Sequence, residues 1–133
     1  MILYLLNEWL NMKIRKRKQK VIEEKDGRKM KTIMLVCSAG MSTSLLVSKM
    51  KAAADEKGVE ADIFAISSSE ATELLNKKST DVLLLGPQVR FMKAQFEKET
   101  ASKNIPVEVI DMRDYGLIDG LKVLNTALEL IGE

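Results

Sequence analysis

The sequence predicts an α/β domain built on a parallel sheet, because short apolar runs alternate with amphipathic helical segments from residue 32 to residue 131. Each apolar run is bounded by turn residues, as expected of a strand buried on both faces. Strict alternation of strand and helix is typical of a parallel sheet with helices on both faces. Right-handed crossovers then favour a three-layer sandwich with a four-stranded sheet in the order 2-1-3-4.

The strands are predicted from apolar content and length. They fall at residues 32–36, 59–66, 81–85 and 106–110. The run at 32–36 is continuous and apolar, and Gly86-Pro87 stops the third strand. The fourth strand, which starts at Pro106, is short.

The helices are predicted from apolar residues at helical spacing and from their end residues. They fall at residues 42–57, 67–78, 88–103 and 119–131. The residues expected to face the core are Leu45, Leu46, Met50, Ala53, Ala71, Leu74, Leu75, Val89, Met92, Phe96, Leu121, Leu124, Leu128 and Ile131. Gly58 is expected to end the first helix as its C′ residue, and Ser67 with Glu70 predicts a capping box at the start of the second.

The strand order predicts where a ligand binds. The chain reverses its direction across the sheet between the first and third strands, and ligands bind outside the carboxyl ends of strands at such a point. The loop after the first strand lies in the stretch LVCSAGMSTSLL at residues 35–46, and the loop after the third is Gly86-Pro87-Gln88. Topology therefore points to Cys37.

The loop after Cys37 has the composition of an anion site. Gly40 permits a left-handed backbone, and the start of a helix offers unpaired N–H groups and the positive end of its dipole. The same field favours the thiolate form of a cysteine, so Cys37 is predicted as a nucleophile. The predicted phosphate-binding residues are Ser38, Ala39, Gly40, Met41, Ser42, Thr43 and Ser44. The alternative is a small buried thiol beside an ordinary turn, which the coincidence of both features at the reversal point disfavours.

Composition excludes several kinds of chemistry. The chain has one cysteine and no histidine. An internal disulfide, a multi-cysteine or histidine-ligated metal site, a Ser-His-Asp triad and a Cys-His dyad are therefore excluded, and we expect no metal and no cofactor. The loop also lacks the Gly-Lys-Ser/Thr of a Walker A motif and the Gly-x-Gly of a dinucleotide fingerprint.

Two kinds of enzyme use a thiolate on a phosphate loop. A Cys-x5-Arg phosphatase needs arginine at position 43 and an acid from another loop, and this chain has Thr43, with Asp111 and Asp114 as the candidate acids. Without the arginine, the transition state loses a fixed positive charge. The loop therefore suits a phosphoryl carrier better than a hydrolase.

Three stretches resemble one known family. They are CSAGMSTSLL from Cys37, VLLLGPQV from Val82, in which Leu84 is an extra residue, and PVEVIDMRDYGLIDG from Pro106. The body resembles the lactose/cellobiose-type IIB component of the bacterial phosphoenolpyruvate-dependent sugar phosphotransferase system. The resemblance implies a fold similar to low-molecular-weight tyrosine phosphatases, with Cys37 phosphorylated and residues 38–44 as its phosphate loop.

The resemblance also implies a relay and its partners. A phosphohistidine on a IIA protein donates to Cys37, which passes the group to a sugar on the membrane permease IIC. The implied sugar is a β-linked disaccharide such as cellobiose, or lactose, and the implied location is the cytoplasm, at the inner face of the membrane through IIC. The alternatives are a phosphatase or arsenate-reductase-like enzyme, which Thr43 disfavours, and a regulatory module, which an intact Cys37 disfavours.

The first 29 residues are expected to be an extension outside the domain at 30–133. Residues 1–30 carry nine Lys/Arg and four Asp/Glu, whereas residues 31–133 carry twelve and fifteen, so we expect no nucleic-acid binding by the body. The opening MILYLLNEWL is too short to span a membrane and precedes its basic cluster, unlike a signal peptide. We therefore expect no direct membrane insertion, and Met30 as the start of the domain, with a surface anchor as the alternative.

Four other residues near the loop are of interest, and two of them, Arg90 and Tyr115, are open to two interpretations. Gln88 lies beside the loop, and Arg90 either attracts phosphate or is a solvated residue of a first helical turn. Tyr115 either lines a docking rim or packs in a turn, and Met41 is expected to be an apolar contact for IIA and IIC.

Overall fold

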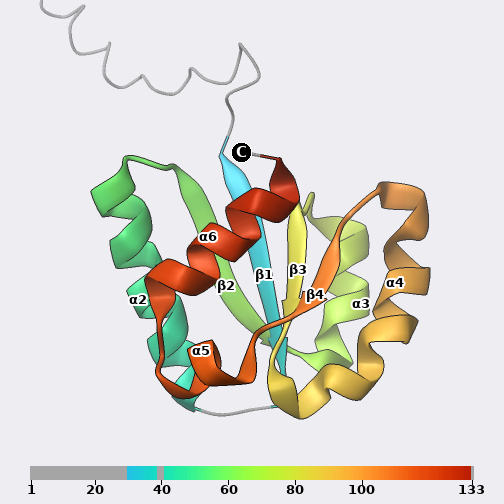
Figure 1. The fold of residues 1–133 in the computed structure, drawn as a ribbon. Coiled ribbons are helices and arrows are strands. Elements are labelled where there is room, and N and C mark those ends of the chain that lie inside the picture. Colours follow the sequence, from blue (N-terminus) through green and yellow to red (C-terminus); the bar gives the residue numbers. More distant parts are fainter. Residues whose placement is uncertain (1–29, 39–40, 133) are drawn as a thin grey trace, which may run out of the picture. The chain divides into compact units, whose positions relative to one another are not determined.

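Four parallel strands form one sheet in the order β2-β1-β3-β4, which confirms the predicted order (Figure 1). The computed structural model describes residues 30–38 and 41–132. The strands are β1 (Lys31–Cys37), β2 (Ala61–Ser67), β3 (Val82–Leu85) and β4 (Val107–Val109). Each lies within one or two residues of its predicted bounds, because turn residues and Pro106 restrict where pairing begins and ends.

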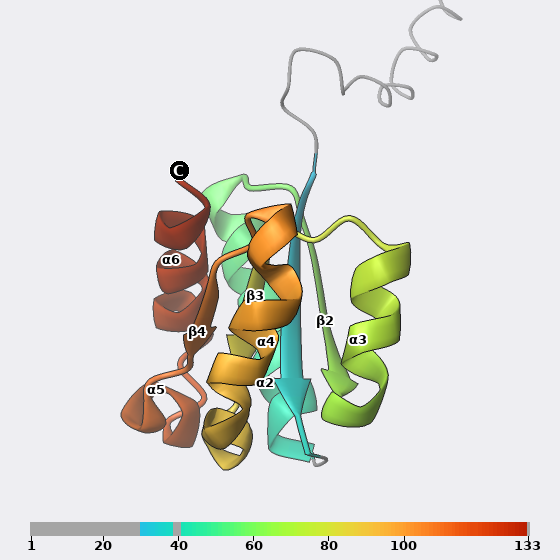
Figure 2. The same ribbon diagram turned by 90° about the vertical axis from the view of Figure 1, so that its right-hand side faces the viewer.

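Helices cover both faces of the sheet. The helical elements are α2 (Met41–Lys57), α3 (Ser68–Lys77), η1 (Pro87–Met92), α4 (Lys93–Thr100), η2 (Ala101–Lys103), α5 (Met112–Gly116) and α6 (Gly120–Ile131). Helices α2 and α6 lie on one face, and α3 and α4 on the other (Figures 1 and 2). Side chains alternate along β1, so that Ile33 and Leu35 join the core cluster under α2 and α6, and Met34 and Val36 join the cluster under α3 and α4.

The end of α2 has the predicted glycine geometry. Gly58 has φ +71°, its N–H donates to Asp55 O at 3.2 Å, and the Val59 N–H donates to Ala54 O at 2.9 Å. These two bonds form a Schellman motif, in which glycine avoids the cost of a left-handed backbone.

The predicted capping box at the start of α3 is wrong. Ser67 occupies the N-cap position but makes no side-chain capping bond. Its Oγ lies 3.1 Å from Ser69 Oγ instead. Sequence spacing identified the position, but the hydroxyl rotamer that closes the box depends on neighbouring hydroxyls that compete for it.

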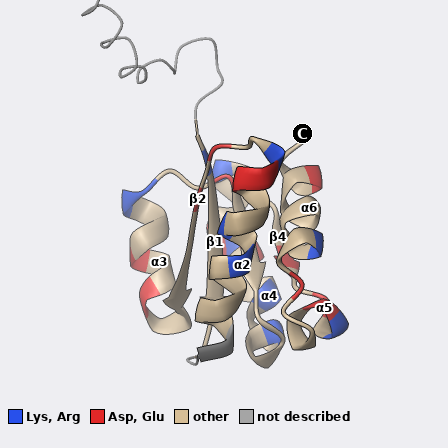
Figure 3. Ribbon diagram, turned by 90° about the vertical axis from the view of Figure 1, so that its left-hand side faces the viewer, with Lys and Arg blue, Asp and Glu red and all other residues tan. Residues whose placement is uncertain are grey.

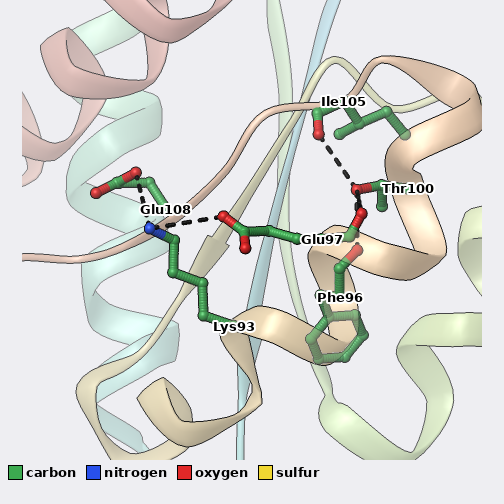
Figure 4. Close-up of polar contacts among 6 residues, drawn as sticks. All are labelled: Lys93, Phe96, Glu97, Thr100, Ile105 and Glu108. Atoms are coloured by element: carbon green, nitrogen blue, oxygen red, sulfur yellow. Dashed lines mark hydrogen bonds and ion pairs between the residues drawn. The ribbon is translucent and has the colours of Figure 1, made fainter.

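The predicted continuous helix at residues 88–103 is also wrong. The segment is a 3₁₀ turn, a short α-helix and a second 3₁₀ turn, with a break at Val89, where φ is −116° and ψ is 23°. Thr100 Oγ, which is buried, bonds to Phe96 O at 2.9 Å and to Ile105 O at 3.3 Å (Figure 4). This hydroxyl bonds both to its own helix and to the segment before β4, and regular α-helix ends at Thr100.

One lysine joins α4 to the sheet. Lys93 Nζ lies 3.7 Å from carboxylate oxygens of both Glu97 and Glu108 (Figure 4). The three side chains are partly exposed, so each pair contributes at most about 1 kcal/mol to stability.

Two leucines predicted to face the core are exposed. Leu45 is 47% exposed and Leu121 is 50% exposed. The reason is that α2 and α6 pack against each other as well as against the sheet. A Cβ atom built on Gly120 would lie 2.5 Å from the backbone carbon of Lys49. This close approach rotates the buried side of α6 toward Val123 and Leu124.

Among residues 30–38 and 41–132, the structure has no helix that is long and apolar enough to cross a membrane.

Candidate functional site

Cys37 is the last residue of a central strand. It ends β1, which lies between β2 and β3, and its side chain is 7% exposed. Its thiol lies 3.9 Å from Ile66 O, at the limit of a weak S–H···O contact. Ser38, directly after it, is exposed. The thiol is therefore close to the surface at the carboxyl edge of the sheet, yet shielded by its own strand neighbours.

The loop after β3 lies beside Cys37, as the strand order predicted. The Gly86 N–H donates to Val36 O at 2.8 Å. A Cβ atom on Gly86 would lie 3.8 Å from Cys37 Cβ and 2.9 Å from Gln88 Oε1. The absence of a side chain at Gly86 thus brings the exposed Gln88 amide close to the strand end that carries the thiol.

The start of α2 supplies the far end of the predicted phosphate loop. Thr43 is 3% exposed, Ser44 is exposed, and Thr43 Oγ1 lies 2.9 Å from Tyr115 Oη. Ala39, Gly40 and the side chains of Met41 and Ser42 lie outside the described residues, so the expected apolar contact at Met41 remains a prediction.

Tyr115 belongs to a short helix that the sequence analysis did not predict. Asp111 caps α5 by accepting hydrogen bonds from the N–H groups of Arg113 at 2.8 Å and Asp114 at 3.3 Å. Tyr115 is half-buried against the core cluster under α2 and α6, so the packed interpretation is confirmed. A five-residue helix has no measurable apolar period. Topology could have placed Tyr115 near the site, because the segment after β4 must emerge at the same edge of the sheet as Cys37.

The two candidate acids, Asp111 and Asp114, make contacts away from the Cys37 thiol. Asp111 caps α5, and Asp114 Oδ1 lies 3.8 Å from Lys122 Nζ. Arg90 is exposed and donates from Nη1 to Pro87 O at 3.0 Å, within its own turn. These contacts favour the solvated interpretation of Arg90. Asp111 is engaged as the cap of α5, and Asp114 forms an ion pair with a lysine of α6.

The site is nearly free of charged side chains. Residues 37–48 and 86–89 contain no Asp, Glu, Lys or Arg. On α5, basic and acidic residues lie side by side (Figure 3). An anion at this edge would therefore be held by backbone N–H groups, hydroxyls and a helix dipole rather than by a cationic clamp. The described residues thus place a thiol next to the N-terminus of α2 and to hydroxyl side chains, without a cationic side chain in these segments.

Comparison with known proteins gives a consistent result. Residues 32–126 match the family described as "PTS system, Lactose/Cellobiose specific IIB subunit". The chain is 50% identical over 102 residues to the oligo-beta-mannoside-specific EIIB component of Bacillus subtilis, covering 77% of this chain and 97% of that protein. It is 49% identical over 104 residues to the galactose-specific EIIB component of Lactococcus lactis subsp. cremoris, covering 76% of this chain and 96% of that protein.

Two solved structures share the fold. The cellobiose-specific IIB component of Borrelia burgdorferi is 42% identical, with a TM-score of 0.64, and the match covers 79% of this chain and 94% of that one. The lactose-specific IIB domain of Streptococcus pneumoniae is 16% identical, with a TM-score of 0.68 and coverage of 76% and 97%. The second likeness concerns the fold alone.

Proposed function

Because the chain belongs to the lactose/cellobiose-specific IIB family of the sugar phosphotransferase system, and is thus a phosphotransferase that works with IIA and IIC components, we propose that Cys37 is its phosphoryl acceptor. The observation that carries this proposal is the place of the thiol. It ends the central strand β1, beside Gly86 and next to the N-terminus of α2. This chain has no histidine. The proposed transfer does not require one here, because the phosphohistidine belongs to the IIA donor.

The transfer is an in-line displacement at phosphorus. The Cys37 sulfur forms an S–P bond as the P–N bond of the IIA phosphohistidine breaks, and the imidazole leaves with the bonding electron pair. In the second step a sugar hydroxyl attacks the same phosphorus, the S–P bond breaks and the thiolate is restored, while the hydroxyl proton passes to water or to a base on IIC. Positioning and charge stabilisation are the main demands on the protein.

The proposed phosphate-binding residues are those of the loop after Cys37. They are Ser38, Ala39, Gly40, Met41, Ser42, Thr43 and Ser44. Neutral donors bind the phosphoryl group without the fixed positive charge that would speed its hydrolysis, which suits a carrier that must keep the group until the sugar arrives. The direct test is to incubate the protein with phosphorylated IIA and map the modified residue by mass spectrometry, with Cys37 expected.

The sugar is proposed from the relatives. Their printed specificities are oligo-β-mannoside, galactose and cellobiose. We propose a β-linked disaccharide such as cellobiose, or lactose, presented by IIC at the cytoplasmic face of the membrane. Transport assays with one IIC and several sugars would test this proposal.

The docking face for IIA is proposed at the carboxyl edge of the sheet. In Figure 1, α5, η1 and the start of α2 lie together at this edge. Among the described residues, all exposed large apolar side chains except Met30 are in segments at or next to this edge: Leu45, Phe91, Met112, Leu117 and Leu121. A phosphohistidine reaches a 7%-exposed thiol only if its protein covers this edge, and exposed apolar side chains there favour such a contact.

Replacing Phe91 by glutamate should weaken docking. Phe91 is 78% exposed, so the fold loses little, but a charge at an apolar contact raises the KM for phosphorylated IIA by about tenfold or more. Steady-state transfer kinetics measure this effect. Ser79→Glu is the matched control, because it adds the same charge at the exposed turn before β3, at the opposite edge. Equal KM values for the two variants would show that Phe91 is not part of the docking face.

The protein should not turn over aryl phosphates. Position 43 is threonine, and residues 37–48 lack a cation. Asp111 caps α5, and Asp114 pairs with Lys122 of α6. We expect release of p-nitrophenol from its phosphate to stay at the background rate over hours. Sustained release that disappears in a Cys37→Ala variant would place the protein among the phosphatases instead.

A further inference from the structure

We infer that Tyr115 is a positioning residue for phosphoryl transfer, acting through its hydrogen bond to Thr43. This inference rests on the proposed function of Cys37 and adds a residue outside the phosphate loop. Tyr115 Oη lies 2.9 Å from Thr43 Oγ1, and the two residues are separated by 72 positions in the sequence. The bond therefore ties the segment after β4 to the first turn of α2.

The Thr43 hydroxyl is shut off from solvent. Thr43 is 3% exposed, and its Oγ1 has Tyr115 as its hydrogen-bond partner within the described part of the chain. A buried hydroxyl without a partner is costly, so the bond fixes the rotamer of Thr43. A hydroxyl both accepts and donates. When Tyr115 donates, Thr43 keeps its own proton for a phosphoryl oxygen bound at the start of α2.

The structure holds Tyr115 in place from both ends of α5. Asp111 caps the N-terminus with two hydrogen bonds. At the C-terminus, Ile118 has φ +54°, and the N–H groups of Ile118 and Asp119 bond to Tyr115 O at 3.1 Å and Asp114 O at 2.9 Å. Glycine usually takes this position in a Schellman motif.

A β-branched residue in the left-handed region is strained and persists only where its surroundings hold it. Ile118 is held by packing against the core cluster under α2 and α6, which also contacts Tyr115. A helix of five residues does not persist in water without such support. Tertiary packing thus fixes the place of the Tyr115 hydroxyl, although α5 itself is short and largely exposed.

The test is Tyr115→Phe, which removes one oxygen atom and keeps the ring in the core. In single-turnover transfer from phosphorylated IIA, we expect the rate constant at saturating IIA to fall about threefold to tenfold. The KM for IIA should stay within about twofold, because the ring and the exposed apolar neighbours are intact. The matched control is Thr72→Val, which removes a hydroxyl that donates to Glu99 at 2.7 Å on the opposite face of the sheet.

A double-mutant cycle separates positioning from general loosening of the fold. Thr43→Val should slow transfer by a similar factor, and Tyr115→Phe added to it should cause no further loss, whereas Thr43→Ser should retain most of the rate. Additive losses, an unchanged rate for Tyr115→Phe, or a raised KM with an unchanged rate constant would each overturn the inference. If Cys37 is not the residue that gains phosphate, the proposed function fails instead, and peptide mapping of the same reactions reports that outcome separately.

Discussion

Replacing Cys37 by serine is expected to abolish phosphate acceptance while the fold is retained. Serine is of similar size, and its hydroxyl can occupy the place of a side chain that is 7% exposed. A thiolate is accessible near neutral pH, whereas a serine hydroxyl needs a base, and this chain has no histidine to supply one. The transfer rate from phosphorylated IIA should fall on the order of a thousandfold or more, about 4 kcal/mol of transition-state free energy.

The matched control is Ser44→Ala, at an exposed hydroxyl of the proposed phosphate loop. It removes at most one neutral hydrogen bond, so the rate should fall no more than about tenfold. Thermal unfolding of all three proteins should differ by only a few degrees. If the serine variant still takes phosphate from IIA at a comparable rate, Cys37 is not the phosphoryl acceptor.

Replacing Gly120 by alanine is expected to be the most destabilising Gly→Ala change among the glycines that the structure describes. The new Cβ would lie 2.5 Å from the Lys49 carbonyl carbon and 2.7 Å from the Met50 nitrogen. Backbone atoms cannot rotate away, so α6 must shift from α2. We expect a loss of about 3 kcal/mol in the free energy of unfolding, and a fall in Tm of roughly 10 °C or more. Urea and thermal denaturation would measure both.

Gly116→Ala is the control for this change. Gly116 is also helical and close in sequence, but a Cβ atom there would have no neighbour within 4 Å. Alanine is the better helix former, so stability should stay within about 1 kcal/mol of the parent. If the two variants have the same Tm, the close approach of α2 and α6 does not require glycine at position 120.

The sequence by itself determined the fold class and predicted the residue on which the proposed site centres. Both depend on local signals. Apolar runs of strand length, alternating with helical periodicity, leave few topologies for a parallel sheet, and the observed order is the predicted one. The stretch from Cys37 to Ser44 combines a strand end, a glycine and four hydroxyl residues in eight consecutive positions, so the sequence alone predicts an anion site there.

Only the tertiary structure decided which distant residues meet. The contact of Tyr115 with Thr43 spans 72 positions and depends on α5, a helix stabilised by its caps and by the core rather than by its own sequence. Leu45 and Leu121 match the helical period but are exposed, because Gly120 lets α6 pack on α2 at a rotation that buries other residues. Periodicity reports that a helix has an apolar face, whereas the packing partner decides which part of that face is buried.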